Sequence, residues 1–262
     1  MKGRVLIIAG SDSGGGAGIQ ADIKTVTMLG GYAATAITAI TVQNTLGVTG
    51  VVGVDPAVVE AQGRAVLDDI GADAIKTGML ADSATVQAAA RLIDHAGVPA
   101  VIDPVMVAKG GASLLADEAV DAVRTLMVPR AALLTPNAPE AAALTGVAVE
   151  DIEGQRAAGR ALLALGARAV LMKGGHVEGD RVTDLLLTAA GEHVFTAPRL
   201  DSRHTHGTGC TLASACAAGL AQGLSLPDAV ERAIDYVRGA IAAAPGLGAG
   251  HGPLDHGWRL RS

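Results

Sequence analysis

A chain of 262 residues is long enough for one large α/β domain and short for two. Hydrophobic residues make up 50% of it, which allows a sizeable core, whereas aromatic residues make up only 2%, so few rings can stack on bases. The net charge of −6 and the lack of a run of Lys or Arg argue against a nucleic-acid partner. No apolar stretch reaches the ~18 residues of a membrane helix, and two cysteines are too few for a disulfide framework. We therefore expect a cytoplasmic protein without a membrane partner.

Short runs rich in Val, Ile and Thr alternate with longer alanine-rich helical patterns along the chain. The first half predicts strand 5–9, helix 19–29, strand 34–42, helix 56–70, strand 74–77, helix 83–95 and strand 100–103. The second half predicts helix 116–127, strand 132–135, two further helices, strand 169–173, an antiparallel pair at 182–187 and 193–197, and helices 208–222 and 227–244. This alternation predicts a three-layer αβα fold, with a mainly parallel central sheet, helices on both faces and a small antiparallel addition late in the chain.

Residues 206–211, with the sequence HGTGCT, come directly before an alanine-rich helix. Glycines let the backbone turn tightly so that successive N–H groups converge, and the helix start adds a partial positive charge of roughly half a unit. This combination predicts an anion hole suited to a transferring phosphoryl group. Cys210 lies in the turn, and we expect its pKa to fall below the ordinary ~8.5. The alternative is an ordinary glycine turn with a structural cysteine, which is how we interpret Cys216 inside the helix.

A glycine-rich segment at 10–18, GSDSGGGAG, follows the first predicted strand. It lacks the Lys-Ser/Thr ending of a P-loop, and its backbone could either cradle a phosphate or let a flat substrate approach closely. Residues 16–21 fit a loose dinucleotide fingerprint, which keeps an NAD-dependent oxidoreductase as an alternative. However, no acidic residue ends the second strand, where a ribose contact would be needed.

Several strand ends carry polar side chains, and ligands of parallel sheets bind at those ends. Lys173 can reach an anion there or be merely solvated. Asn137 and Glu140 form a capping-box pattern, and the same oxygens could hold Mg²⁺ through water beside phosphates. Asp103, which precedes a proline, is either a loop acid or a magnesium-side carboxylate. The carboxamide of Gln43 offers one acceptor and two donors to an aminopyrimidine edge, or is merely solvated.

Taken in order, these segments resemble the hydroxymethylpyrimidine/phosphomethylpyrimidine kinases of thiamine biosynthesis. The resemblance spans residues 5 to about 240 and rests on GSDSGGGAGIQAD at 10–22, TVQN at 41–44, KTGML at 76–80, DPVM at 103–106, TPN at 135–137, MKGGH at 172–176 and HGTGCT at 206–211. The last motif is specific, because many sugar kinases of the wider ribokinase-like superfamily carry Asp where this chain has Cys210. The resemblance implies a single ribokinase-like kinase domain over 1–262, a homodimer, and MgATP as donor for two successive phosphorylations.

The resemblance also implies roles for individual residues. The residues implied for catalysis are Cys210, which would activate the substrate hydroxyl, and Lys173, Gly207 and Gly209. Those implied for substrate binding are Gln43, Gly10, Asp22, Met79 and Val105. Those implied for the nucleotide are Asn137, Lys173 and Thr208, and those implied for Mg²⁺ are Asp103 and Glu140.

Two alternatives remain beside the oxidoreductase. Pyridoxal kinase has the same fold and chemistry, although Gln43 and Met79 favour the pyrimidine. A non-catalytic pyrimidine-binding sensor is a different class of protein, but it would need neither Lys173 nor Cys210. None of these hypotheses gives the C-terminal segment 246–262 a role.

Overall fold

The computed structural model describes residues 1–106, 114, 118–177 and 179–261. Within them, one nine-stranded sheet runs in the order β3-β2-β1-β4-β5-β6-β7-β8-β9. Its strands are β1 (Arg4–Asp12), β2 (Tyr32–Asn44), β3 (Gly47–Gly53), β4 (Ala74–Thr77), β5 (Ala100–Ile102), β6 (Leu133–Leu134), β7 (Ala169–Met172), β8 (Arg181–Thr188) and β9 (Gly191–Pro198). The central strands are continuous apolar runs because both faces of the sheet are covered.

Most of the longer helices begin at a residue whose side chain caps them. The helices are α1 (Gly18–Met28), α2 (Pro56–Asp69), α3 (Ser83–Ala96), α4 (Ala119–Ala122), α5 (Ala138–Thr145), α6 (Ile152–Ala164), α7 (Thr208–Ala221) and α8 (Leu226–Ala242). The side chains of Asp55, Asp82, Asp151 and Ser225 accept N–H groups at the starts of α2, α3, α6 and α8. The helix predicted at 116–127 is α4 followed by a π-helical turn at Val123–Met127, and its first two residues lie outside the described chain.

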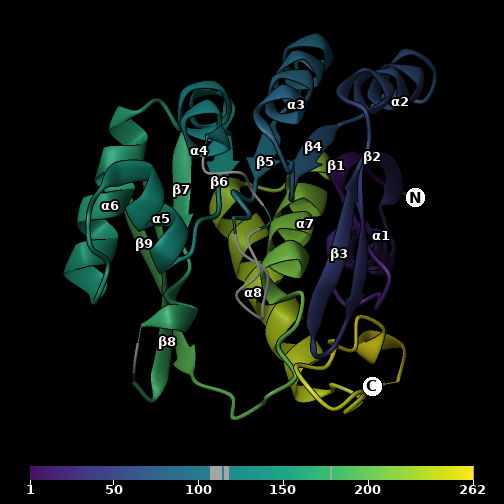
Figure 1. Ribbon diagram of the computed structural model, residues 1–262. Helices are drawn as coiled ribbons and strands as arrows, with labels where there is room; N and C mark the ends of the chain where they lie inside the picture. Colours follow the sequence, from purple (N-terminus) through teal and green to yellow (C-terminus); the bar gives the residue numbers. More distant parts are fainter. Residues whose placement is uncertain (107–113, 115–117, 178, 262) are drawn as a thin grey trace.

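Helices cover both faces of the sheet, as the sequence predicts (Figure 1). One hydrophobic core packs α2 to α6 against side chains such as Leu6, Ile8 and Ile75. The other packs α1, α7 and α8 against the alternate side chains of the same strands, such as Val5 and Ile7. Adjacent strand residues point to opposite faces, so β1 contributes to both cores. The result is the expected three-layer αβα architecture.

Antiparallel strands lie at both edges of the sheet. The strands from β2 and β1 through β7 run parallel, and β8 and β9 form the predicted antiparallel addition. The other edge carries β3, which pairs antiparallel with β2 and which the sequence patterns do not predict. Its sequence, GVTGVVG, contains three glycines and is mostly solvent-exposed, so it shows neither an apolar run nor a clear alternation.

The order of the strands fixes where a ligand can bind. The chain leaves β1 through α1 to reach β2 on one side, and it later returns through α2 to place β4 on the other side of β1. The helices that follow β1 and precede β4 lie on opposite faces of the sheet, so a crevice opens at the carboxyl ends of these two strands. The first glycine-rich segment leaves β1 at this crevice.

The C-terminal segment after α8 folds back along the molecule. Figure 1 shows it beside the lower tip of the β2–β3 hairpin, and the N–H of His251 donates to the carbonyl of Thr45 there at 2.9 Å. Among the described residues, no helix is both long and apolar enough to cross a bilayer.

Candidate active site

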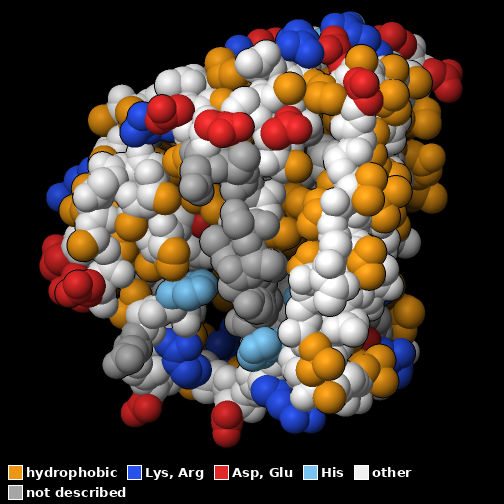
Figure 2. Space-filling view, viewed as in Figure 1, with side chains coloured by type: hydrophobic (Ala, Val, Ile, Leu, Met, Phe, Trp, Pro, Cys, Tyr) orange, Lys and Arg blue, Asp and Glu red, His pale blue; other side chains and the backbone are white. Residues whose placement is uncertain are grey.

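Two adjoining cavities open at the carboxyl ends of the parallel strands. The first has a volume of about 500 Å³ and lies over β1, β4, β5 and the start of α7. The second has a volume of about 1110 Å³ and is bounded by β8, β9 and α8. Figure 2 shows a hollow between these strands and the β2–β3 hairpin, with His, Lys and Arg side chains around it. The residues that line both cavities are Lys173, Gly175, His176, Thr205, Thr208 and Gly209.

The turn at the start of α7 has the backbone geometry that the predicted anion hole requires. Gly207 is the N-cap residue, with φ of +85°, and no side chain caps the helix. The first N–H groups of a helix have no intrahelical acceptor. That of Thr208 donates to the carbonyl of Thr205 at 3.4 Å, which leaves those of Gly209 and Cys210 at the cleft end of α7 for a ligand. A Cβ at residue 207 would lie 1.8 Å from the carbonyl oxygen of Gly16, so only glycine fits this turn.

The predicted pKa of Cys210 is wrong in direction. Its sulfur lies between two helix starts, because the N–H of Gly18, the first residue of α1, also bonds to it. Burial nevertheless raises the pKa of the thiol to about 11, against the opposing effects of Lys76 and Gly18. The helix termini favour the thiolate, but desolvation at the closely packed floor of the cleft is the larger effect. Cys210 is therefore a neutral thiol in the free protein, and Cys216 is buried in the core as expected.

Lys173 is held between two carboxylates at the wall shared by the cavities. Its Nζ lies 2.9 Å from Asp103 and 3.6 Å from Glu140. Burial opposes the charge on Lys173, but these carboxylates outweigh it and raise the lysine's pKa, so the ammonium persists at neutral pH. A Cβ at Gly209 would lie 3.3 Å from the same Nζ, which places the lysine directly beside the helix start. The ammonium of Lys173 and the N–H groups at the start of α7 can therefore contact the same anion.

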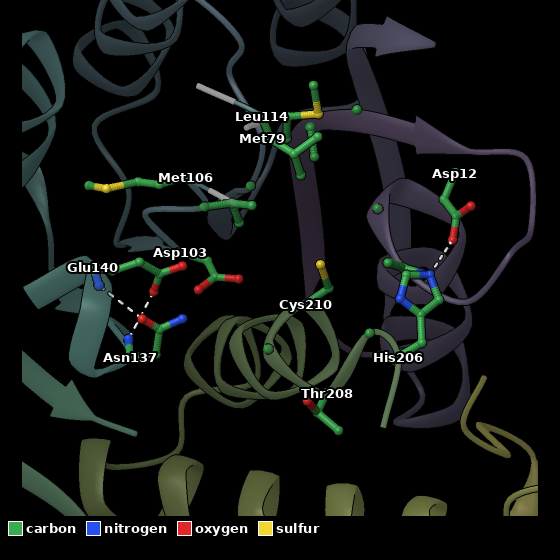
Figure 3. Close-up of a pocket in the computed structure, with 18 of the residues that line it drawn as sticks. Asp12, Met79, Asp103, Met106, Leu114, Asn137, Glu140, His206, Thr208 and Cys210 are labelled. Carbon is green, nitrogen blue, oxygen red and sulfur yellow. Dashed lines mark hydrogen bonds and ion pairs between the residues drawn. The ribbon is translucent and has the colours of Figure 1, made fainter. Parts of the chain in front are cut away.

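Asn137 and Glu140 form the capping box that the sequence predicts. The side chain of Asn137 accepts from the N–H of Glu140 at 2.9 Å, and Glu140 accepts from the N–H of Asn137 at 2.8 Å. Figure 3 shows both residues on the same side of the cleft as Asp103, with Cys210 toward the middle. Burial raises the pKa of Glu140, although Lys173 opposes this.

The same carboxylates suit a water-mediated magnesium ion. Within the described chain, no cluster of three or more His, Cys, Asp and Glu residues could hold a metal by itself. Mg²⁺ usually binds through one or two carboxylates, waters and substrate phosphates, however. Lys173 and Thr135 contact Oδ1 of Asp103, and Lys173 and Asn137 contact Oε2 of Glu140. The other oxygen of each carboxylate, Oδ2 and Oε1, has no hydrogen-bond partner among the described residues, so the donor set fits this mode.

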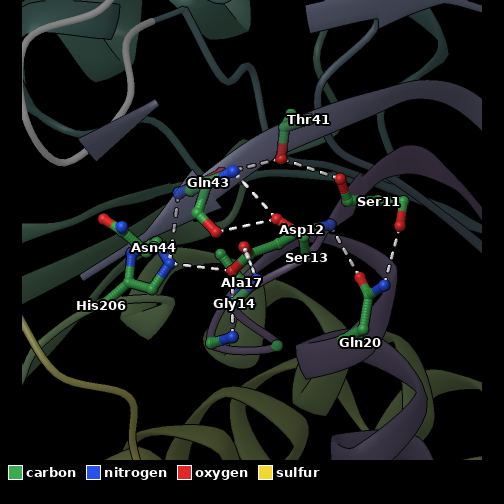
Figure 4. A network of polar contacts seen from close by, with 12 residues as sticks. Ser11, Asp12, Ser13, Gly14, Ala17, Gln20, Thr41, Gln43, Asn44 and His206 are labelled. Atoms are coloured by element: carbon green, nitrogen blue, oxygen red, sulfur yellow. Dashed lines mark hydrogen bonds and ion pairs between the residues drawn. The ribbon is translucent and has the colours of Figure 1, made fainter. Parts of the chain in front are cut away.

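Across the cleft, a polar network surrounds Gln43 (Figure 4). The hydroxyl of Thr41 donates to its amide oxygen at 3.1 Å, and its amide nitrogen lies 3.3 Å from Nε2 of His206. The same Nε2 lies 2.9 Å from the carboxylate of Asp12. The pair between Asp12 and His206 is not visible in the sequence motifs, because 194 positions separate the two residues.

Asp12 explains the glycine-rich segment that follows β1. Its carboxylate accepts the N–H groups of Gly14, Gly16 and Ala17 at 2.8 to 2.9 Å. Burial opposes ionisation, but His206 and these N–H groups outweigh it and hold the pKa of Asp12 below its usual value. Because these donors are already occupied by a carboxylate, the loop is not a phosphate cradle. This removes the main feature that favoured a dinucleotide-binding oxidoreductase.

Asp22 is not on the cleft wall, where the resemblance implied that it would bind substrate. Its side chain is 0% exposed, and both of its oxygens lie 2.8 Å from Nζ of the equally buried Lys76. The hydroxyl of Ser214 also donates to it, at 2.7 Å. An isolated buried charge is costly, so the two side chains pair beneath the cleft floor. Lys76 lines the cleft and its charge favours the Cys210 thiolate, whereas the charge of Asp22 opposes that thiolate, so Asp22 influences the site from below without lining it.

The other implied substrate residues do line the first cavity. Gly10, Met79 and Val105 form part of its wall, together with Met106 and Leu114. Figure 3 shows Met79, Met106 and Leu114 at the side opposite α7. A Cβ at Gly10 would lie 3.1 Å from the sulfur of Met79, so glycine keeps this part of the cleft open. The cavity therefore combines an apolar wall with the polar edge of Gln43.

Comparison with known proteins links this geometry to a group of vitamin kinases. The sequence profile of the family described as phosphomethylpyrimidine kinase matches residues 12–255. The hydroxymethylpyrimidine/phosphomethylpyrimidine kinase of Streptomyces coelicolor is 54% identical, over 98% of this chain and 95% of that protein. The thiamine biosynthesis bifunctional protein ThiED of Geobacter sulfurreducens is 52% identical, over 97% of this chain and 52% of that protein.

A solved structure matches the whole chain. It is the Staphylococcus aureus pyridoxal kinase in complex with AMP-PCP and pyridoxal, with a TM-score of 0.92 and 34% sequence identity. The match covers 100% of this chain and 96% of that one. The ribokinase-like fold implied by the motifs is thereby confirmed.

The first prediction concerns Gly207. Replacing it with Ala places a methyl group against the Gly16 carbonyl and should weaken the binding of pyrophosphate, measured by calorimetry, by at least about tenfold. The matched control is Gly223→Ala, because Gly223 has a similar φ of +81° but open space around it. That control should lose only about 1 kcal/mol of stability and keep its affinity. Equal affinity in the two variants would contradict an anion hole at this turn.

Proposed function

This chain belongs to the phosphomethylpyrimidine kinase family, and we propose that it phosphorylates 4-amino-5-hydroxymethyl-2-methylpyrimidine and then the resulting monophosphate, using ATP, in thiamine biosynthesis. The observation that carries the proposal is the position of Lys173 and the start of α7, at the wall between two cavities of unequal size. If one substrate occupies each cavity, a phosphoryl group transferred between them must pass the wall where Lys173 and the start of α7 lie. We take residues 1–262 as one kinase domain that works in the cytoplasm, where ATP is available.

The two cavities suit the two substrates differently. The first has an apolar wall and the carboxamide of Gln43, which fit a flat aminopyrimidine and its polar edge. The second is larger and its lining includes Arg199, Arg203 and Arg238, which fit a nucleotide with its phosphates. The Staphylococcus aureus structure, which holds AMP-PCP and pyridoxal together, supports a two-ligand arrangement in this fold.

Phosphoryl transfer requires mostly positioning and charge stabilisation. In the first step, the acceptor hydroxyl forms a new bond to phosphorus as the bond between that phosphorus and ADP breaks, and the hydroxyl proton passes late to an oxygen of the transferred phosphoryl group. In the second step, a phosphate oxygen of the monophosphate is the acceptor. The N–H groups of Gly209 and Cys210 and the Nζ of Lys173 stabilise the charge on the transferring group. Losing one such donor typically lowers the rate by ~10²–10³. Asp103 holds Lys173 in place for this contact.

Magnesium fits beside this point. Asp103 and Glu140 would hold the ion through water, with Asn137 capping the helix that carries Glu140. The ion would neutralise charge on the nucleotide phosphates when it is bound.

Cys210 positions the hydroxyl rather than ionising in advance. Because burial raises its pKa to about 11, the thiol is neutral at physiological pH. A loose transition state needs little deprotonation of the attacking hydroxyl, so a neutral thiol beside it suffices. Lys76 below the floor would stabilise a thiolate if the proton were transferred.

The second prediction tests the reaction itself. Purified protein is incubated with MgATP and either hydroxymethylpyrimidine or pyridoxal, and the products are identified by mass. We expect one and then two phosphates on the pyrimidine. A single phosphate on pyridoxal alone would mean that the mechanism is right and the acceptor wrong. No transfer to either would favour a pyrimidine-binding sensor.

The third prediction concerns Cys210. We expect Cys210→Ala to lower kcat by at least about tenfold and to leave MgADP affinity unchanged, since the variant keeps every N–H group of the turn. Because the thiol is neutral, kcat of the parent should not change with pH near the ordinary cysteine pKa of ~8.5. The pH profiles of the parent and of Cys210→Ala should therefore have the same shape in this range. The control is Cys216→Ala, which alters a buried cysteine away from the cleft. Near-normal turnover in Cys210→Ala would contradict the assigned role.

We further propose a homodimer. Ile40, Val42 and Val52 are exposed and lie on one face of the β2–β3 edge, since Ile40 pairs with Val52 and Val42 is two residues along the same strand. Val52 alone is 64% exposed. An exposed apolar face on an edge strand favours association with another chain. A second copy of this chain is the partner that the family resemblance implies.

The fourth prediction tests this dimer by sedimentation. The parent should sediment at twice the 26.0 kDa mass of one chain, and Val52→Glu should sediment as a monomer. Leu165→Glu at the end of α6 is the control, because Leu165 is 38% exposed and α6 packs against β7 and β8, far from β3 in the sheet order. A parent that is monomeric at micromolar concentration, or a Val52→Glu variant that remains a dimer, would contradict the proposed interface.

A further inference from the structure

Residues 246–258, which we name the C-terminal strap, take no part in the mechanism above. The strap leaves the end of α8 and passes below the β2–β3 hairpin (Figure 1). It carries the only tryptophan of the chain, Trp258. Its contacts connect both sides of the first cavity.

The strap first contacts the turn between β2 and β3. The N–H of His251 donates to the carbonyl of Thr45 at 2.9 Å, and the N–H of Gly250 donates to the Thr45 hydroxyl at 3.3 Å. A Cβ at Gly250 would lie 2.1 Å from the Thr45 carbonyl oxygen, so the close approach requires glycine. Thr45 follows Gln43 by two residues, and this contact therefore supports the acceptor side of the cleft.

The strap next contacts the anion-hole turn. The N–H of His206 donates to the carbonyl of Gly252 at 3.2 Å, and His206 pairs with Pro253 as an isolated bridge. A Cβ at Gly16 would lie 3.2 Å from Cβ of Pro253 and 2.4 Å from the His206 ring. The strap, the glycine loop and the turn before Gly207 are thus in close van der Waals contact.

The third contact is made by His256. Its Nε2 lies 3.0 Å from the hydroxyl of Thr211, and both side chains are buried. Thr211 directly follows Cys210 in the first turn of α7. Burial lowers the pKa of His256 to about 4, with Lys24 as a further cause, so the ring is neutral near pH 7. Protonation therefore does not disturb this hydrogen bond at physiological pH.

Two contacts anchor the strap to α8. The carbonyl of His256 accepts from the hydroxyl of Tyr236 at 2.7 Å, and the indole N–H of Trp258 donates to the Tyr236 carbonyl at 3.2 Å. A Cβ at Gly239 would lie 2.3 Å from the Trp258 ring, which shows how closely the ring packs on the helix. These contacts with α8 hold the backbone of His256 in place, so its ring has a fixed position beside Thr211.

We propose that His256 is a positioning residue, which holds the Gly207–Cys210 turn in place through Thr211 and, through the rest of the strap, in register with Gln43. The inference rests on the proposed function, because it assigns the turn to phosphoryl transfer. The N–H groups of the turn are expected to bind the transition state more strongly than the bound substrates. A displaced turn should therefore lower kcat and change KM little, since Gln43 and the nucleotide cavity stay intact.

The fifth prediction is tested by turnover of hydroxymethylpyrimidine with MgATP. His256→Leu keeps the bulk of the side chain and removes the hydrogen bond, and we expect kcat to fall about tenfold with KM values within about twofold. His256→Gln places an amide near the position of Nε2 and should recover most of kcat. Thr211→Val removes the same bond from the other side, so it should show a similar loss and the double variant no further loss. His193→Leu, on the exposed face of β9, is the control.

A second readout does not depend on the identity of the substrate. In His256→Leu, amide hydrogen exchange should rise over residues 204–212 while α3 keeps the exchange rates of the parent. Parent-like kcat in His256→Leu, or losses that multiply in the double variant, would overturn the inference. Unchanged exchange over residues 204–212 would also overturn the role of His256, whichever acceptor the enzyme uses. Activity on another acceptor alone would refute the proposed function but not the role of His256.

Discussion

The ion pair between Lys173 and Asp103 determines how the rest of the cleft can work. Lys173 directly follows β7 and Asp103 directly follows β5, so the pair joins the ends of two strands that β6 separates in the sheet. It holds a positive charge 3.3 Å from where a Cβ of Gly209 would lie, at the start of α7. A helix start alone provides only a partial charge, and a lysine alone would be free to move. Together they define one point where negative charge is favoured.

The acceptor half of the cleft is built around a second charge. Asp12 gathers three N–H groups of the glycine loop and the ring of His206, which in turn lies beside Gln43. The glycine loop is therefore a support for the acceptor side and not a phosphate site. Because His206 directly precedes Gly207, the same residue links the Gln43 side of the cleft to the anion hole. The C-terminal strap also links the two sides, because His251 bonds to Thr45 near Gln43 and His256 bonds to Thr211 in α7.

Local patterns predict most of the fold, since β-branched runs and alanine-rich helices follow their periods closely. They fail for β3, which is an exposed, glycine-rich edge strand whose pairing with β2 is not visible in its own sequence. The motifs predict the turn before α7 and the capping box, because local backbone geometry determines these features. They also place Lys173 at a strand end, but not its ion pair with Asp103, 70 positions away. They fail for the pKa of Cys210, which depends on burial, and for Asp22, whose partner Lys76 lies 54 positions away. Long-range pairs such as Asp12 with His206 likewise need the folded chain.

The central claim is that the phosphoryl group is transferred at the start of α7 beside Lys173. The most direct test is a crystal structure with MgADP, aluminium fluoride and hydroxymethylpyrimidine. We expect the fluoride group to contact the N–H groups of Gly209 and Cys210 and the Nζ of Lys173, with the hydroxymethyl group beside Cys210 and the amino edge at Gln43. A fluoride group bound at the glycine loop after β1, or away from α7, would contradict it.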